Sequence, residues 1–108
     1  MTDTRVYSSI RVSPMPDTTM LVAARDVMAA EFSAEVVLLN LEDGVYYGLE
    51  DVGSRVWALL QSPVAIRTVL DTIAAEFDVD PARCERDVGS FLQQLVDRGL
   101  ADVCGDAR

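Results

Sequence analysis

The chain has 108 residues, half of them hydrophobic and a quarter charged, a composition that fits one packed globular domain. All nine basic residues are Arg, against 18 Asp and Glu, so the net charge is −9 and a basic face for nucleic-acid phosphates is not expected. Histidine is absent, which removes the commonest general base and the commonest neutral metal ligand. This composition argues against an enzyme, a metal site and a nucleic-acid partner.

The two cysteines, Cys84 and Cys104, form no C-x-x-C pair and have no zinc-like spacing. The N-terminus lacks the basic and apolar regions of a secretion signal, and no apolar run approaches the ~18 residues of a membrane span. We therefore expect a cytoplasmic protein with reduced thiols, no cofactor and no membrane partner.

The N-terminal segment 1–20 is rich in Ser, Thr, Asp and Pro and is interpreted as a tail-like extension, with room for one short strand near Val6–Val12. Residues 21–103 are predicted to form the folded domain, and residues 104–108 a C-terminal tail. No internal repeat or low-complexity tract is visible.

Three strands are predicted at the front of the domain. The first covers 27–32, although the sequence around it also has helical composition. The second covers 35–41, which is rich in β-branched residues and leucine. Glu42, Asp43 and Gly44 then predict a hairpin turn in which Gly44 takes a positive φ, and 45–49 is the returning strand. An antiparallel meander of this size needs helices to cover it.

Three helices follow, according to the spacing of apolar residues. The first is expected from Asp51 to Gln61. The second is expected to open with Ser62 as its cap and Pro63 at its first position, and to end at Phe77. The third is expected to open with Asp80 and Pro81 in the same way and to stop at Gly99. This third helix, of about 18 residues, is the longest predicted element.

Aromatic residues and glycines are concentrated between residues 39 and 60. Tyr46 and Tyr47 are adjacent in a predicted strand, so their side chains point to opposite faces. Trp57 lies beside an apolar stripe and is predicted to be a core residue. Gly48 weakens the strand unless another backbone approaches there, and both a packing role and a binding role stay open for it.

Binding through the backbone is the function that this composition leaves open. If the strand at 45–49 is a sheet edge and the third helix lies across it, an extended peptide can add a strand in the groove between them. An acidic domain suits a basic or neutral peptide.

The segments VVLLNLEDGVYYGLEDVGSRVWALL (36–60) and VLDTIAAEFDVDPARCERDVGSFLQQLVDRGLADV (69–103) resemble the PqqD family, also called RiPP recognition elements. The matching features are the hairpin, the V-G-x-x-x-W opening of the first helix, the A-x-E-F-D-V-D link and the L-x-x-x-G-L ending. The resemblance implies an α+β fold of the winged helix-turn-helix type, with a three-stranded antiparallel sheet followed by three helices.

The resemblance also implies a function. Such proteins are non-catalytic chaperones that bind the leader of a ribosomally made precursor peptide and present it to a modifying enzyme or leader peptidase in natural-product biosynthesis, lasso peptides included. The implied peptide site lies between the last strand and the last helix and comprises Val45, Tyr46, Tyr47, Gly48, Leu49, Asp87, Val88, Phe91, Leu92, Gln94, Leu95 and Arg98.

Two features depart from the family pattern. Members usually carry Asn or Asp as the cap that follows the last strand, whereas this chain has Glu50, with Asp51 as a substitute. The N-terminal extension is longer than the family needs, and it could cover the sheet edge, contact the partner enzyme or pair with a second copy in a homodimer.

Two other functions stay open. The first is a winged-helix DNA-binding regulator, although Arg83, Arg86 and Arg98 are balanced by acidic residues on the same helix. The second is a non-catalytic structural subunit whose edge strand is already paired within a larger complex.

Overall fold

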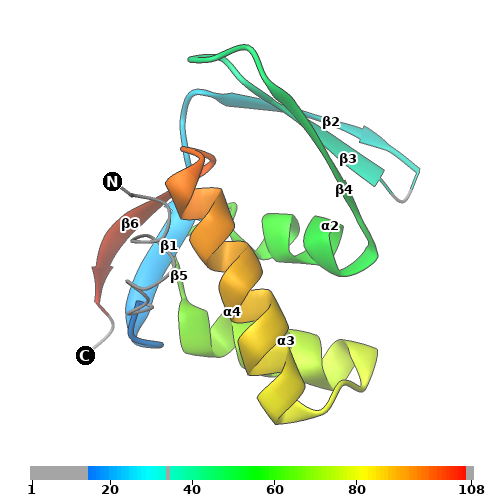
Figure 1. The fold of residues 1–108 in the computed structure, drawn as a ribbon, viewed down its shortest axis with the longest axis vertical. Helices are drawn as coiled ribbons and strands as arrows, with labels where there is room; N and C mark the ends of the chain where they lie inside the picture. The colour runs from blue at the N-terminus through cyan, green and yellow to red at the C-terminus, as the bar shows by residue number, and fades with distance from the viewer. Residues whose placement is uncertain (1–14, 34, 107–108) are drawn as a thin grey trace, which may run out of the picture.

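A computed structural model describes residues 15–33 and 35–106 of the chain. Two small antiparallel sheets lie around three helices (Figure 1). Helices α2 (Asp51–Leu59), α3 (Ile66–Phe77) and α4 (Pro81–Asp97) follow the hairpin sheet in the chain, in the order expected from the sequence. The predicted α+β fold of the winged helix-turn-helix type is confirmed.

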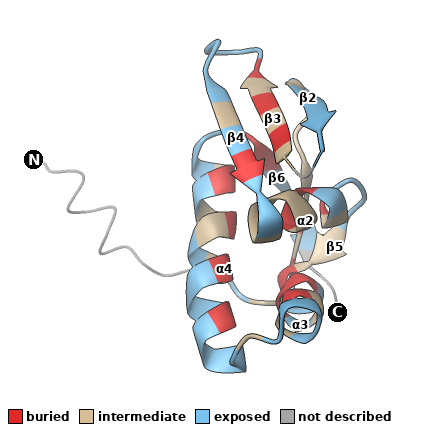
Figure 2. Cartoon of the chain, turned by 90° about the vertical axis from the view of Figure 1, so that its right-hand side faces the viewer, coloured by how far each residue is buried: buried red, intermediate tan, exposed pale blue. Residues whose placement is uncertain are grey.

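The hairpin sheet is the predicted meander, with strand order β2-β3-β4. Its strands are β2 (Val27–Phe32), β3 (Glu35–Asn40) and β4 (Tyr46–Glu50), so the strand interpretation of 27–32 holds over the helical one. Gly44 has a φ of 73° in the turn between β3 and β4, as expected. In this sheet β2 and β4 are the two edge strands, and α4 lies on the side of β4 (Figure 2).

A second sheet was not predicted from the sequence. It has the order β5-β1-β6 and consists of β1 (Thr19–Ala23), β5 (Val64–Ala65) and β6 (Ala101–Asp106). The predicted boundaries of the domain at residues 21 and 103 therefore cut through β1 and β6. The expected strand near Val6–Val12 lies outside the described residues.

The predicted start of α3 is wrong. Ser62 and Pro63 do not open a helix, because Val64 and Ala65 first pair with Leu21 and Met20 of β1. Helix α3 begins only at Ile66, and Ala65 at its N-cap supplies no side-chain hydrogen bond. A two-residue pairing with a strand more than 40 positions earlier thus overrides the local Ser-Pro signal.

The ends of α4 agree with the sequence. The Asp80 carboxylate accepts a hydrogen bond from the backbone N–H of Arg83 at 3.1 Å, and Pro81 occupies the first helical position. After the last residue of the helix, Gly99 has a φ of 75°.

The core lies between the two sheets and the helices. Trp57 is 6% exposed, which confirms its predicted core position. The core is otherwise formed by aliphatic side chains from both sheets and all three helices, among them Leu21, Leu38, Leu60, Ile73, Leu92 and Leu100, each at most 1% exposed.

Asn40 is one of two buried polar residues among those described, at 3% exposure. Its side-chain amide donates to the carbonyl of Arg98 at 3.0 Å, and its Oδ1 accepts from the backbone N–H of Glu42 at 2.9 Å. The first bond joins the end of β3 to the C-terminal end of α4 across 58 positions of sequence. Asn40 therefore fixes the hairpin relative to the longest helix.

We expect Asn40→Ala to lower the free energy of unfolding by ~1–3 kcal/mol, because it leaves the Arg98 carbonyl and the Glu42 N–H without these partners. Asn40→Asp should cost at least as much, since a carboxylate cannot donate to the carbonyl. Urea denaturation measures both, with the exposed Gln94→Ala as the control. An Asn40→Asp protein as stable as the parent would contradict this role.

Candidate peptide-binding site

The open side of β4 presents free backbone groups. The Asn40 N–H donates to the Val45 carbonyl at 3.0 Å. Bonded and non-bonded pairs alternate along an antiparallel ladder, so the next bonded pairs are Leu38 with Tyr47 and Val36 with Leu49. The N–H groups of Tyr46, Gly48 and Glu50 consequently point away from β3. No other strand among the described residues pairs with this side of β4.

The side chains of β4 alternate as predicted. Tyr47 and Leu49 point to the inner face, where Leu49 is 8% exposed, whereas Tyr46 is 68% exposed on the outer face. The Tyr47 ring lies under the guanidinium of Arg98, with 5.8 Å between the Arg98 Cζ and the ring centroid. This cation–π contact places both predicted residues at the hairpin end of the space between β4 and α4.

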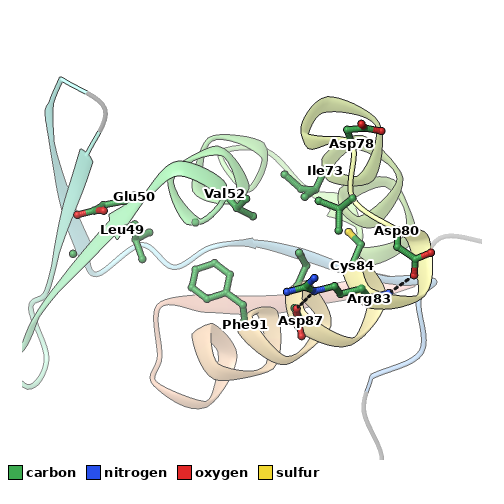
Figure 3. A pocket seen from close by; sticks show the side chains of 14 residues that line it. Leu49, Glu50, Val52, Ile73, Asp78, Asp80, Arg83, Cys84, Asp87 and Phe91 are labelled. Carbon is green, nitrogen blue, oxygen red and sulfur yellow. Dashed lines mark hydrogen bonds and ion pairs between the residues drawn. The ribbon is translucent and has the colours of Figure 1, made fainter.

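A cavity of about 720 Å³ lies at the other end of β4, between the start of α2, the α3–α4 link and α4. Five of the predicted site residues line it: Gly48, Leu49, Asp87, Val88 and Phe91. Figure 3 shows the Phe91 ring pointing across the cavity toward Leu49. Gly53 lies beside this contact, since a Cβ built on it would be 3.5 Å from the Phe91 Cζ and 3.6 Å from the Leu49 Cβ.

The remaining predicted residues have different positions. Leu92 and Leu95 are 0% and 2% exposed, so they belong to the core that underlies this face of α4. Val45 and Gln94 are exposed and do not line the cavity. The sequence therefore named residues of β4 and of α4 that line the cavity, but it did not separate core residues of α4 from those at the cavity.

The cavity also has walls that the sequence analysis missed. They come from the end of β4, the α2 start, α3, the α3–α4 link and the first turn of α4: Glu50, Val52, Gly53, Ile73, Asp78, Val79, Asp80, Arg83 and Cys84. The A-x-E-F-D-V-D link was noted only as a family feature, although its left-handed Asp78 (φ 53°) turns the chain so that Val79 reaches the cavity.

Four carboxylates and one guanidinium form the polar rim of the cavity. Asp87 lies 3.5 Å from Arg83 and 3.4 Å from Arg86, and Asp80 caps α4, as the dashed lines in Figure 3 show for Arg83. Asp78 and Glu50 take part in no ion pair among the described residues. The rim is therefore acidic around an apolar floor.

The packing around position 48 does not require a glycine. A Cβ built on it would meet only Glu35 Oε2, at 3.4 Å, which is the end of a flexible side chain. The proposed role of Gly48 in a close approach by a second backbone stays a prediction.

The start of α2 has no side-chain cap. Glu50 is the N-cap residue and makes no side-chain hydrogen bond, and Asp51 does not replace it but takes a φ of 46°. The first N–H groups of a helix need partners from side chains, water or a ligand. In this protein the first N–H groups of α2 lie at the edge of the cavity.

Among the described residues that line the cavity, Cys84 is the one thiol. The described residues contain no cluster of three or more His, Cys, Asp or Glu suited to a metal. The Cys84 thiol lines the cavity but donates to the Leu70 carbonyl at 3.4 Å, and burial, with Asp71 and Asp87 nearby, raises its pKa. Among the described helices none is long and apolar enough to cross a membrane.

Comparison with known proteins identifies the family. Residues 35–101 match the family described as PqqD, coenzyme PQQ synthesis protein D. The chain belongs to the PqqD family. The predicted family membership is thereby confirmed, and the match spans the hairpin, all three PqqD helices and the start of β6.

A solved structure is similar as well. TbiB1, in the structure described as TbiB1 in complex with the TbiA(beta) leader peptide, is 39% identical to this chain, with a TM-score of 0.71. The alignment covers 79% of this chain and 99% of TbiB1. A search of curated proteins gave no match.

We expect one of the two thiols to react in the native protein. Cys104 is exposed on β6, whereas Cys84 is 2% exposed and its raised pKa keeps the thiol protonated at neutral pH. A thiol reagent should label one cysteine per chain at pH 7 and two in denaturant, as measured by mass spectrometry. Rapid labelling of Cys84 in the folded chain would contradict the closed cavity wall.

Proposed function

We propose that this PqqD-family protein binds the leader segment of a ribosomally synthesised precursor peptide, which adds as a strand to the open side of β4, and presents the precursor to a modifying enzyme or leader peptidase. The observation that carries this proposal is the side of β4 that no described strand pairs with, which lies beside an apolar cavity. Family membership and the similarity to TbiB1, whose structure holds a leader peptide, support the same function.

The mechanism follows from the arrangement of the edge. The N–H and C=O groups of Tyr46 and Gly48 provide main-chain hydrogen bonds that do not depend on the peptide sequence. Alternate side chains of the added strand share the inner face with Tyr47 and Leu49 and enter the cavity beside Phe91. The acidic rim favours neutral or basic residues of the leader. The protein acts by holding and orienting the precursor, without chemistry of its own.

The DNA-binding alternative is less well supported. The basic side chains near the start of α4 are already compensated, since Arg83 and Arg86 both lie near Asp87. A duplex reader needs a positive surface on its recognition helix. Tight binding of duplex DNA in a low-salt gel shift would reverse this ranking.

The finer points of the function stay proposals. The partner enzyme and a lasso-peptide or other product class are expectations from the resemblance, and the cytoplasmic location is an expectation from the lack of a secretion signal in the sequence. The genes next to this one test the class, because a short precursor with a peptidase or a radical enzyme would define it.

Proline variants of β4 provide the sharpest test of strand addition. Tyr46→Pro removes an N–H that points to the open side of β4. It should abolish binding of a labelled leader peptide, taken from a precursor gene next to this one, while the fold is retained. Tyr47→Pro removes an N–H that bonds to Leu38 and should lower the melting temperature. Fluorescence titration and thermal melts measure both effects. Unchanged leader affinity in a folded Tyr46→Pro protein would show that the peptide binds elsewhere.

A matched pair on α4 tests the cavity. Phe91→Ala should weaken leader binding by about 1–3 kcal/mol, because Phe91 is half-buried at the cavity wall. Leu92→Ala, at the adjacent fully buried position, should instead lower the free energy of unfolding by ~2–5 kcal/mol. Urea denaturation and the same titration separate the two. Equal leader affinity in Phe91→Ala and the parent would remove Phe91 from the site.

A further inference from the structure

Among the described residues no strand pairs with the outer side of β2, which is therefore a second edge, at the side of the hairpin sheet away from β4 (Figure 2). It pairs with β3 over six residues without a register shift. Its sequence VMAAEF contains no Pro, Lys or Arg, and its one charged residue is Glu31. Natural proteins usually protect such edges with prolines, lysines or bulges, because a bare edge pairs with other strands.

The free backbone groups of β2 are defined by the ladder with β3. The Leu41 N–H donates to the Asp26 carbonyl at 2.9 Å. By the alternation of the ladder, the next bonded positions on β2 are Met28 and Ala30, and the N–H groups of Val27, Ala29 and Glu31 point to the open side.

The side chains next to this edge are apolar and exposed. Met28 and Phe32 are 58% and 57% exposed, and Ala30 lies between them on the same outer face. Tyr46 of β4 extends the same face two strands away. Met28, Phe32 and Tyr46 thus place three of the large exposed hydrophobic residues of the described chain on one side of one sheet.

We propose that β2 is a self-association edge, at which a second copy of this chain pairs its own β2 antiparallel about a two-fold axis at Ala29. This pairing sets Ala29 opposite its own copy, and Val27 opposite Glu31 of the second copy. All three outward N–H groups of each strand then find carbonyl partners, and the outer faces of the two sheets join. The result is a continuous six-stranded sheet with β4 at both ends, so both peptide edges stay open. The dimer does not depend on the peptide-binding function.

The charges on β2 fit a second copy in this orientation. In this register Asp26 lies opposite Phe32 and Arg25 lies opposite Ser33, so Arg25 is diagonal to Glu31 of the second copy, two positions away on the same face. Glu31 never faces Glu31. The small Ala29 side chain permits close approach at the axis. Since each copy carries a net charge of −9, salt screens the general repulsion and should strengthen the dimer.

Light scattering of the full chain over a concentration series, at low and high salt, measures the association. The expected result is a rise from 11.8 kDa toward twice that mass, at lower concentration in high salt. A mass of 11.8 kDa throughout overturns the proposal and leaves the face to a different partner.

Two pairs of variants test the edge itself. Ala29→Pro removes an outward N–H and should give a folded monomer, whereas Ala30→Pro removes an N–H bonded to Val37 and should lower the melting temperature. In a Cys104→Ser background, Ala29→Cys should oxidise to a disulfide-linked dimer and Ala30→Cys should not, because only position 29 faces itself. A dimer that survives Ala29→Pro, or equal crosslinking at both positions, overturns the proposal.

Discussion

The bond from the Asn40 amide to the Arg98 carbonyl sets the geometry on which the peptide groove depends. β4 is tied to β3 by its ladder, and the C-terminal end of α4 is tied to the hairpin through this bond and the contact between Arg98 and Tyr47. A buried amide is costly to leave unsatisfied, so its position specifies one separation of strand and helix. At the other end, Phe91 against Leu49 and Gly53 fixes the same separation by packing. The strand and the helix are therefore held at both ends of the space between them, and the cavity lies at the Leu49 end.

The two edges of the hairpin sheet differ in what lies beside them. β4 has α4 and a cavity next to it, so an added strand gains side-chain pockets as well as main-chain bonds, which is the condition for selective recognition of a peptide. No β2 residue lines that cavity, and the outer face of the described β2 is exposed and apolar, so β2 offers main-chain pairing beside an apolar face. The β2 edge therefore suits an identical strand from a second copy, whereas the β4 edge, with a cavity beside it, suits a peptide of defined sequence.

Much of the hairpin sheet and the helices could be predicted from the sequence, because local signals and tertiary contacts agree there. Gly44 in the turn, Asp80 and Pro81 at the start of α4 and Trp57 in the core each follow from local chemistry. The second sheet could not be predicted, since β5 has only two residues and β1 and β6 join positions about 80 residues apart. The predicted start of α3 was wrong for the same reason, because Val64 and Ala65 pair with β1 before the helix begins.

The candidate site shows the same division between local and tertiary information. Helical periodicity places Val88, Phe91, Leu92 and Leu95 on one face of α4 but does not say which of them the cavity reaches. That depends on Asp78, whose left-handed conformation turns the chain where Val79 joins the start of α2 in the cavity lining. The cavity lies where the start of α2, the α3–α4 link and α4 meet. The sequence pattern of α2 and of the link indicates only how each of these segments packs.

The joint between β4 and α2 connects strand addition to the helix layer. No linker separates β4 from α2, because the strand ends at Glu50 and the helix begins at Asp51. The chain turns from strand to helix through a positive φ at Asp51, which is unfavourable for a residue other than glycine. This turn keeps the last outward N–H of the edge adjacent to the uncapped first turn of α2. A peptide added along β4 would therefore reach the first N–H groups of α2, to which the N-cap side chain makes no hydrogen bond. A side-chain cap at Glu50 would satisfy these donors internally, so the poor cap that departs from the family pattern leaves them available to the backbone of a bound peptide.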